Sequence, residues 1–519
     1  MLLRLFLYIF FIFDMCFAQI IHQLSVDRFT HYDIADWISY APALFITSID
    51  LDDNYIYFGT RFGGILRYQK YDNRWDFPYT TSSGLRSNTI YQISYNALDG
   101  FLYARTPEGI DVYKPAERFW RPAEVDQIPL ESNNINSLPN LYPDARDAPY
   151  RFPPFSRPTN DELPDFFTSV SLVYHMGGII YDRYNRSFKF TDRIVDSWQR
   201  LWVGTNGFGP MKAELDNTFL ESILQGLPDI SPRDIYIDNG SFWIGGLRTG
   251  ETIGGITQWE PKVDRWEYFE APFISQLYKD DVKVITGNIN FILFGTPLGV
   301  TVFDKKKHKW KTFDVQDGLN GYSVSDVVIQ GDSAYIAAEY GLNWLNLKSL
   351  NIYESHETTL DNVNINQLAS DGHLIWAATR FGLYSIDPAT DKINFHRSKA
   401  AIPDYNLTAV EIINDQVWMA NRNGIFYWER KSDEWYSFPG LNFNGIIRDI
   451  AYTKNTVWFA SDQGLLRYNI QKDYWRLYTT RDGLISNNTF RIDEENRKIW
   501  ISTDKGICAF RWKRKGRID

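Results

Sequence analysis

Arginine, asparagine and phenylalanine residues recur at matching places along this chain, and they are the side chains most able to bind a ligand. Arg61 and Arg380 each precede a phenylalanine in turns of the same kind. An arginine fork suits a carboxylate, sulfate or phosphate, and the neighbouring ring can stack on a sugar. The candidate ligand-binding residues are Arg61, Phe62, Arg86, Asn88, Arg105, Arg248, Arg380, Phe381 and Arg422.

A second interpretation gives these residues a local structural role. Asparagine tolerates turn geometry and caps backbone groups, and an exposed arginine keeps a surface soluble. The loop from Arg248 to Gly254 is longer than its counterparts, and the proline-rich stretch 121–165 is a long irregular segment. Such loops are usually either functional or disordered, so both remain candidate sites.

The sequence contains only isolated residues and incomplete motifs where catalysis or metal binding would need a complete one. The seven histidines occur singly, and the run Asp50–Asn54 lacks the glycine and glutamate that a calcium loop requires. Residues 204–209 have part of a dinucleotide fingerprint, but no helix is expected to follow them. The sequence therefore predicts no catalytic motif, metal or cofactor. Carboxylates from separate repeats could still meet in a channel.

These side chains belong to a repeat that must position them. An aromatic strand, a turn closed by glycine, a second strand and a third aromatic strand return with most spacings between 40 and 46 residues. Four antiparallel strands per repeat predict an all-β fold, the β-propeller with four-stranded blades. The anchor positions are Tyr57, Tyr103, Trp202, Trp243, Leu293, Tyr335, Trp376, Trp418, Trp458 and Trp500.

The repeat count leaves the architecture partly open. About 10–11 blades are expected, either in one wide ring or in two smaller propellers. The last repeat has three strands, so an N-terminal strand at 28–32 is predicted to complete it. The proline-rich insertion 121–165 is followed by a degenerate blade at about 166–192. Most tryptophans stand inside strands and are predicted to form the core between blades.

The repeat resembles that of the two-component regulator propellers. The resemblance rests on phrases such as Trp376–Leu383 and on Asp482-Gly483-Leu484 followed by Asn487. It implies the extracytoplasmic ligand-sensing region of hybrid sensor kinases, or an exported protein that carries this region alone. We find no kinase or response-regulator pattern, so the resemblance implies the second form.

The N-terminal residues 1–18 predict an export signal, with Arg4 before an apolar run and a small residue, Ala18, at the cleavage site. No later apolar run predicts a membrane span. Without this signal only Cys508 remains, which excludes an internal disulfide. The net charge of −10 argues against nucleic acid as a partner. A periplasmic or extracellular location is expected.

Three functions are compatible with these sequence features. We favour an exported ligand-binding or scaffold propeller that binds a glycan, an anionic small molecule or an exported protein without catalysis, with a separate sensor or surface protein as a possible partner. The alternative is a carbohydrate-active hydrolase or lyase with carboxylates facing a channel. A purely structural surface protein is the third. A propeller fold hosts all three, so the fold does not decide among them.

Overall fold

The computed structural model describes residues 20–124, 152–169, 171–250, 253–354, 358–398, 405–438 and 440–514. The chain divides into two compact units. We call residues 20–25 and 315–478 the inserted unit, and residues 26–314 and 479–514 the flanking unit. Each is described by itself. The predicted signal and residues 125–151 of the proline-rich insertion lie outside the described residues.

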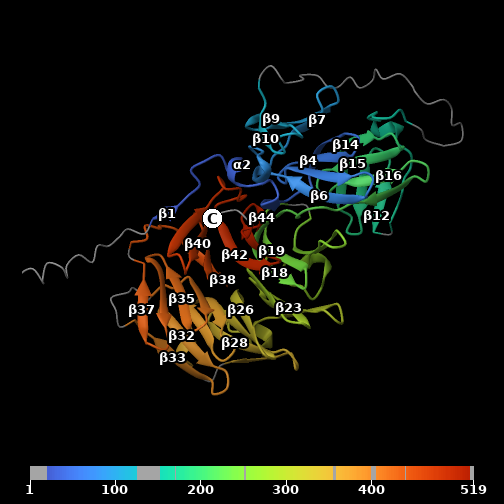
Figure 1. The fold of residues 1–519 in the computed structure, drawn as a ribbon. Helices are drawn as coiled ribbons and strands as arrows, with labels where there is room; N and C mark the ends of the chain where they lie inside the picture. Colours follow the sequence, from blue (N-terminus) through green and yellow to red (C-terminus); the bar gives the residue numbers. More distant parts are fainter. Residues whose placement is uncertain are drawn as a thin grey trace, which may run out of the picture. The chain divides into compact units, whose positions relative to one another are not determined.

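The inserted unit consists of four antiparallel sheets of four strands, which follow one another from yellow to orange in Figure 1. A short strand, β1 (Ile21–His22), adds to the outer edge of the last sheet in parallel with β41. The strands are β26 (Val324–Gln330), β27 (Ser333–Ala338), β28 (Gly341–Asn346), β29 (Asn351–Glu354); β30 (Ile365–Ser370), β31 (Ile375–Thr379), β32 (Gly382–Asp387), β33 (Lys392–His396); β34 (Ala409–Ile413), β35 (Gln416–Asn421), β36 (Gly424–Glu429), β37 (Glu434–Ser437); and β38 (Ile447–Thr453), β39 (Thr456–Ser461), β40 (Gly464–Asn469), β41 (Tyr474–Tyr478). The 3-10 turns η5 (Val315–Asp317) and η6 (Thr358–Leu360) also belong to this unit.

The flanking unit contains six further sheets built on the same plan. Their strands are β3 (Ile46–Leu51), β4 (Tyr55–Thr60), β5 (Ile65–Gln69), β6 (Arg74–Tyr79); β7 (Gln92–Asn96), β8 (Phe101–Thr106), β9 (Gly109–Tyr113), β10 (Trp120–Pro122); β14 (Ser187–Val195), β15 (Arg200–Thr205), β16 (Met211–Glu214), β17 (Phe219–Ser222); β18 (Ile230–Asp238), β19 (Ser241–Arg248), β20 (Ile256–Glu260), β21 (Arg265–Phe269); β22 (Val284–Gly287), β23 (Phe291–Thr296), β24 (Gly299–Asp304), β25 (Lys309–Phe313); and β42 (Thr489–Glu495), β43 (Lys498–Thr503), β44 (Gly506–Phe510), β2 (Trp37–Tyr40). Short elements between them are α2 (Arg28–His31), η1 (Thr81–Ser83), η3 (Asn160–Glu162), η4 (Ala271–Phe273), β11 (Phe167–Thr168), β12 (Leu172–His175) and β13 (Ile179–Asp182).

The predicted all-β propeller of four-stranded blades is confirmed. All ten anchor residues lie in the second strand of a sheet, one in each, and all ten are buried. The innermost strands of successive sheets lie side by side, as β26, β30, β34 and β38 do in the inserted unit. The tryptophan anchors fill the space between sheets, as predicted for a core role. The number of rings stays a prediction.

The N-terminal strand joins the last sheet, as predicted, but the strand is not the one we expected. Residues 28–31 form one helical turn, α2, because the Asp27 carboxylate accepts the backbone N–H of Phe29 at 3.0 Å. The strand that pairs with β44 is β2, and the indole of Trp37 stacks on Phe510 with ring centroids 4.0 Å apart. The predicted closing strand at 28–32 is therefore replaced by residues 37–40.

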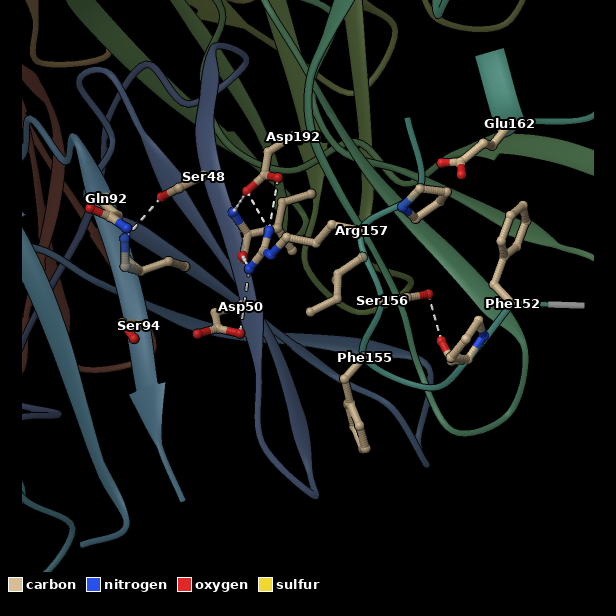
Figure 2. Close-up of a pocket in the computed structure, with 15 residues that line it drawn as sticks. Ser48, Asp50, Gln92, Ser94, Phe152, Phe155, Ser156, Arg157, Glu162 and Asp192 are labelled. Atoms are coloured by element: carbon tan, nitrogen blue, oxygen red, sulfur yellow. Dashed lines mark hydrogen bonds and ion pairs between the residues drawn. The ribbon is translucent and has the colours of Figure 1, made fainter. Parts of the chain in front are cut away.

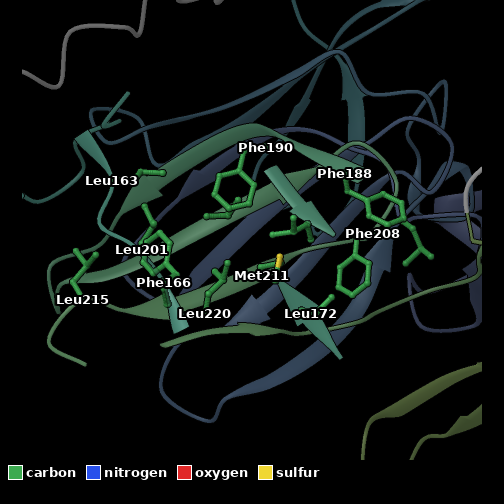
Figure 3. Close-up of a cluster of buried hydrophobic side chains, with 14 of the residues drawn as sticks. Leu163, Phe166, Leu172, Phe188, Phe190, Leu201, Phe208, Met211, Leu215 and Leu220 are labelled. Atoms are coloured by element: carbon green, nitrogen blue, oxygen red, sulfur yellow. The ribbon is translucent and has the colours of Figure 1, made fainter. Parts of the chain in front are cut away.

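The predicted degenerate blade at 166–192 is also corrected. Strands β12 and β13 form a hairpin that pairs with the start of β14, so they extend the sheet β14–β17 and do not make a separate one. The hairpin is held by a large apolar cluster that includes Phe188, Phe190 and Met211 (Figure 3). Burial of apolar surface at roughly 25 cal/mol per Å² makes this the main stabilising term for the added hairpin.

A recurrent hydrogen bond joins neighbouring sheets at their innermost strands. A polar side chain on one strand accepts a backbone N–H of the next sheet's innermost strand. In the flanking unit the Asp234 carboxylate accepts from Ile285 at 2.6 Å. In the inserted unit Asp326 accepts from Leu368 at 2.7 Å. The other bonds of this kind are Ser48 with Ile93, Asp50 with Tyr95, Asp192 with Ile49, Gln367 with Val410, and Asp493 with Ile237.

A β-bulge directs five of these seven side chains toward the neighbouring sheet. The pairing register of the innermost strand shifts immediately before Ser48, Asp192, Asp234, Asp326 and Gln367. A bulge re-aims one side chain and bends the strand. The carboxylate of Asp234 also accepts the N–H of Ile235 at 2.7 Å, so one side chain satisfies two buried donors.

Replacing Asp234 with alanine should lower the free energy of unfolding by about 2–4 kcal/mol, because two buried N–H groups lose a charged acceptor. Asp234→Asn keeps one acceptor oxygen and should lose less. Urea unfolding measures both. Asp72→Ala removes a carboxylate that is 58% exposed and should change stability by about 0.5 kcal/mol or less. Equal losses for Asp72→Ala and Asp234→Ala would contradict the role of this bond.

Candidate functional site

The turn between the second and third strands of a sheet is built the same way in many repeats. The hydroxyl of the last residue of the second strand donates to the carbonyl of the closing glycine, as Thr379 does to Gly382 at 2.8 Å. The glycine is required because its backbone is left-handed; at Gly464 φ is 130°, and a Cβ would lie 2.3 Å from the Tyr478 carbonyl oxygen. In the turns that begin at Thr60 and Thr379, the arginine and phenylalanine that follow the hydroxyl residue are exposed.

Within each unit these turns meet the loops that lead into the innermost strands. In the flanking unit the N–H of Gly64 donates to the carbonyl of Asn88 at 2.9 Å. In the inserted unit the N–H of Asn406 donates to the carbonyl of Arg380 at 2.8 Å. The two sets of predicted residues, from turns and from preceding loops, thus lie at one end of the sheets in each unit.

Three of the nine predicted binding residues are held by the fold. The Arg86 side chain pairs with Asp111, which is fully buried, through an Nε–Oδ1 distance of 2.5 Å. The Asn88 amide oxygen accepts the N–H of Thr81 at 2.7 Å and closes its own loop. Arg248 forms ion pairs with two buried carboxylates, Glu270 at 3.1 Å and Asp280 at 3.2 Å. The observed contacts of these three residues therefore agree with a local structural role.

The other six predicted residues are exposed. Arg61 lies over the Phe62 ring with 5.1 Å from guanidinium carbon to ring centroid, and Arg380 lies over Phe381 at 6.0 Å. The rings of Phe62 and Phe381 are 47% and 54% exposed. Among the described residues no carboxylate forms an ion pair with Arg61, Arg105, Arg380 or Arg422.

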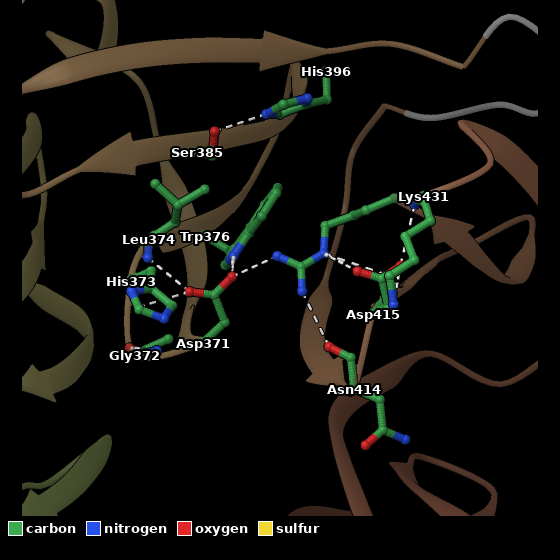
Figure 4. Close-up of polar contacts among 12 residues, drawn as sticks. Asp371, Gly372, His373, Leu374, Trp376, Ser385, His396, Asn414, Asp415 and Lys431 are labelled. Atoms are coloured by element: carbon green, nitrogen blue, oxygen red, sulfur yellow. Dashed lines mark hydrogen bonds and ion pairs between the residues drawn. The ribbon is translucent and has the colours of Figure 1, made fainter.

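A serine–histidine pair in the inserted unit is the arrangement closest to catalytic chemistry. The Ser385 hydroxyl lies 2.7 Å from Nε2 of His396 (Figure 4). Ser385 is only 1% exposed, and the His396 ring packs against Trp428 at 4.8 Å. Burial lowers the pKa of His396. No substrate can reach a hydroxyl in this position, so the pair is a buried polar contact between β32 and β33.

Figure 4 also shows an ion pair that joins two neighbouring sheets of the inserted unit. Arg430 Nη1 lies 2.6 Å from the Asp371 carboxylate, which also accepts the indole N–H of Trp376 at 3.2 Å. Burial would raise the pKa of Asp371, but the N–H bonds from Leu374 and His373, with Trp376 and Arg430, outweigh it and leave the pKa below its usual value. The carboxylate is therefore ionised and structural.

The flanking unit contains a polar cavity of about 580 Å³ at the inner edges of β3, β7 and β14. We call it the inner-edge pocket (Figure 2). Residues 152–158, which belong to the described end of the proline-rich stretch 121–165, form one wall. Two backbone hydrogen bonds between Phe155, Ser156 and Val195 hold them to β14. The polar lining residues are Ser48, Asp50, Gln92, Ser94, Ser156, Arg157, Glu162 and Asp192.

Arg157 points from this wall between two aspartates (Figure 2). Its Nη1 lies 2.8 and 2.9 Å from the two Asp192 oxygens, and its Nη2 lies 3.6 Å from Asp50. Burial raises the pKa of the Asp50 carboxyl to about 6, although Arg157 and the N–H groups of Tyr95 and Leu51 act in the opposite direction. The pocket was not predicted from the sequence, because its lining comes from segments spread over residues 48–194.

Three comparisons place this fold among known proteins. No protein-family model matches the chain. Over 130 residues, 22% of the chain, it is 28% identical to the histidine kinase P4 of Formosa agariphila, and the match spans 9% of that protein. PorZ, a surface component of the type IX secretion system of Porphyromonas gingivalis, has a similar structure with a TM-score of 0.59 at 12% identity, covering 92% of this chain and 87% of PorZ.

The extracellular domains of two putative hybrid two-component systems of B. thetaiotaomicron are similar as well. BT3049 matches with a TM-score of 0.46 at 16% identity over 91% of this chain and 68% of that chain. BT4673 matches with a TM-score of 0.46 at 13% identity, over 92% of this chain and 71% of that chain. The resemblance to two-component regulator propellers is thus confirmed as a likeness in structure. No helix in the described part of the chain is long and apolar enough to cross a membrane.

Arg86, in the loop before β7, and Arg105, on β8, should respond differently to truncation. Arg86→Ala leaves the buried Asp111 carboxylate without its cation and should lower the free energy of unfolding by about 3 kcal/mol. Arg105→Ala removes an exposed side chain and should change it by about 0.5 kcal/mol or less. Urea unfolding compares the pair. Similar values would refute the structural role of Arg86.

The raised pKa of Asp50 predicts a pH dependence. A carboxyl with a higher pKa in the folded state contributes stability that is complete below its unfolded pKa of 3.8 and is lost as pH rises through about 6. Between pH 4 and 7 the wild-type protein should therefore lose about 2–3 kcal/mol relative to Asp50→Asn. Urea unfolding at each pH tests this, with Asp53→Asn as the control. Parallel curves for the wild type and Asp50→Asn would contradict the shift.

Proposed function

We propose that the protein is an exported recognition propeller that binds a glycan at the loop end of its sheets and does not chemically change it. The observation that carries this proposal is a repeated surface pair. The turns Thr60–Gly63 and Thr379–Gly382 both read Thr-Arg-Phe-Gly, and both present an exposed arginine over an exposed ring.

The chemistry of this pair fits an acidic or otherwise oxygen-rich sugar. A half-exposed phenylalanine offers an apolar face to a sugar ring, and the guanidinium beside it donates to hydroxyl, carboxylate or sulfate oxygens. In the inserted unit Tyr340 and Tyr405 add rings that are 53% and 52% exposed in loops at the same end. Preformed loops on a rigid scaffold lose little entropy on binding.

The hydrogen bonds of two pocket carboxylates and the burial of one serine hydroxyl favour recognition over hydrolysis. The two carboxylates that meet in the inner-edge pocket, Asp50 and Asp192, each accept a backbone N–H of a neighbouring sheet. The hydroxyl of Ser385 is buried. An export location, periplasmic or extracellular, is supported by the predicted signal at 1–18 and by the surface setting of PorZ.

Thermal unfolding of the mature protein with neutral, uronic-acid-containing and sulfated oligosaccharides tests this proposal. A glycan at 100 times its Kd should stabilise the fold by about 2.7 kcal/mol. Phe381→Ala and Arg380→Ala should each weaken binding at least tenfold, whereas Tyr436→Ala, on the outer strand β37, should leave it unchanged.

The other outcomes are equally informative. Turnover of the bound glycan would establish the hydrolase or lyase alternative. If no glycan binds but an exported protein does, and Phe381→Ala weakens that complex, the loop end is a protein-docking scaffold. If Phe381→Ala and Arg380→Ala both leave glycan binding intact, the glycan does not bind at these residues.

A further inference from the structure

The inner-edge pocket contains an imbalance of charge that the proposed glycan site does not use. Its charged lining residues are Asp50, Glu162 and Asp192 against a single guanidinium, Arg157. Glu162 is engaged locally, because its carboxylate accepts the N–H and the hydroxyl of Thr159 at 2.6 and 2.9 Å. Two inward carboxylates thus share one cation.

Arg157 satisfies one of these carboxylates much better than the other. Its Nη1 contacts both oxygens of Asp192 at hydrogen-bond distance, and its Nη2 donates to the Ile49 carbonyl at 2.6 Å. The nearest distance from Nη2 to Asp50 is 3.6 Å, which is too long for a hydrogen bond. Asp50 therefore keeps the N–H groups of Leu51 and Tyr95 as its hydrogen-bond donors.

The Asp50 side chain is only 7% exposed, so little solvent offsets its charge. A carboxylate in this position is stabilised most by a second cation placed close to it. The oxygens of Asp50 are fixed in space by the backbone bonds of two sheets, which removes the reorganisation that a flexible carboxylate would need.

The rest of the cavity suits a guanidinium or ammonium group carried on an aliphatic stem. Ser48, Ser94 and Gln92 line the pocket beside Asp50 and provide oxygen acceptors for the remaining N–H donors of such a group. Phe152 and Phe155 stand on the opposite wall, where an aliphatic stem can pack. Arg157 itself shows that a guanidinium fits between the inner strands of two sheets.

We propose that the inner-edge pocket binds a second cationic group, against Asp50 and beside Arg157. The group is a guanidinium or primary ammonium on an aliphatic stem, such as an arginine or lysine side chain presents. The site lies in the flanking unit and uses none of the loop-end residues of the glycan proposal, so the two proposals fail or succeed separately.

Isothermal titration with three small probes tests the proposal. N-acetyl-arginine methylamide and N-acetyl-lysine methylamide carry the charge, and N-acetyl-citrulline methylamide is the neutral isostere of the first. We expect one saturable site for at least one charged probe and at least tenfold weaker binding of the citrulline probe. No saturable binding of either charged probe, or equal binding of the citrulline probe, overturns the proposal.

Variants locate the binding within the pocket. Asp50→Asn should weaken the binding of the charged probe at least tenfold. Asp53→Asn, in the exposed turn that follows, should leave the binding unchanged. Gln92→Trp keeps Asp50 and places a large side chain at the exposed rim, so it should block binding even if Asp50→Asn does not fold. Binding that survives both Asp50→Asn and Gln92→Trp refutes the assignment.

Two further readouts separate this site from other sources of affinity. Binding should weaken as pH falls from 7.5 to 5, because Asp50, which faces Arg157 and Asp192, becomes protonated; a pH-independent affinity contradicts its role. Phe381→Ala, the glycan-site variant, should leave the probe affinity unchanged, and a parallel loss would place the cation at the loop end instead.

Discussion

The bond between an inner-strand side chain and the next sheet's backbone is the constraint on which the arrangement of sheets depends. Apolar burial drives the sheets together but has no direction, so packed faces alone could slide or rotate. A carboxylate such as Asp326 adds direction, because its oxygen must meet one particular N–H, that of Leu368. The bulge before it makes that aim possible. Each sheet is thereby fixed relative to its neighbour within a unit.

The sequence predicts the strands and the core well because both follow from local patterns. Alternation of apolar and polar residues, with an aromatic at each anchor and a glycine at each turn, identifies strands such as Thr456–Ser461 directly. The errors arose where local patterns were ambiguous. Residues 28–31 look like an aromatic strand, and only the cap from Asp27 reveals the helical turn. At 187–195 one strand serves both a hairpin and a sheet, and no local pattern shows how many partners a strand has.

The candidate sites were less accessible to sequence reasoning, and the reasons differ. Arg86, in the loop before β7, and Arg105, on β8, are the same residue type, and what separates them is the position of Asp111. The inter-sheet side chains could have been found, since Ser48, Asp234, Asp326 and Gln367 each stand nine positions before an anchor. The inner-edge pocket could not, because its walls come from strands and a loop that only the fold brings together. Its electrostatics depend on burial, which a single sequence does not give.

The hydroxyl–glycine closure of the turns has an evolutionary consequence. Because Thr379 and Gly382 hold the turn by themselves, Arg380 and Phe381 contribute almost nothing to its geometry. Selection for folding therefore acts on the two ends of each turn, and selection for recognition can act on the residues between them. A propeller of this kind can change its ligand by exchanging two residues per blade, so close relatives with the same scaffold are expected to diverge first, and furthest, at these paired positions.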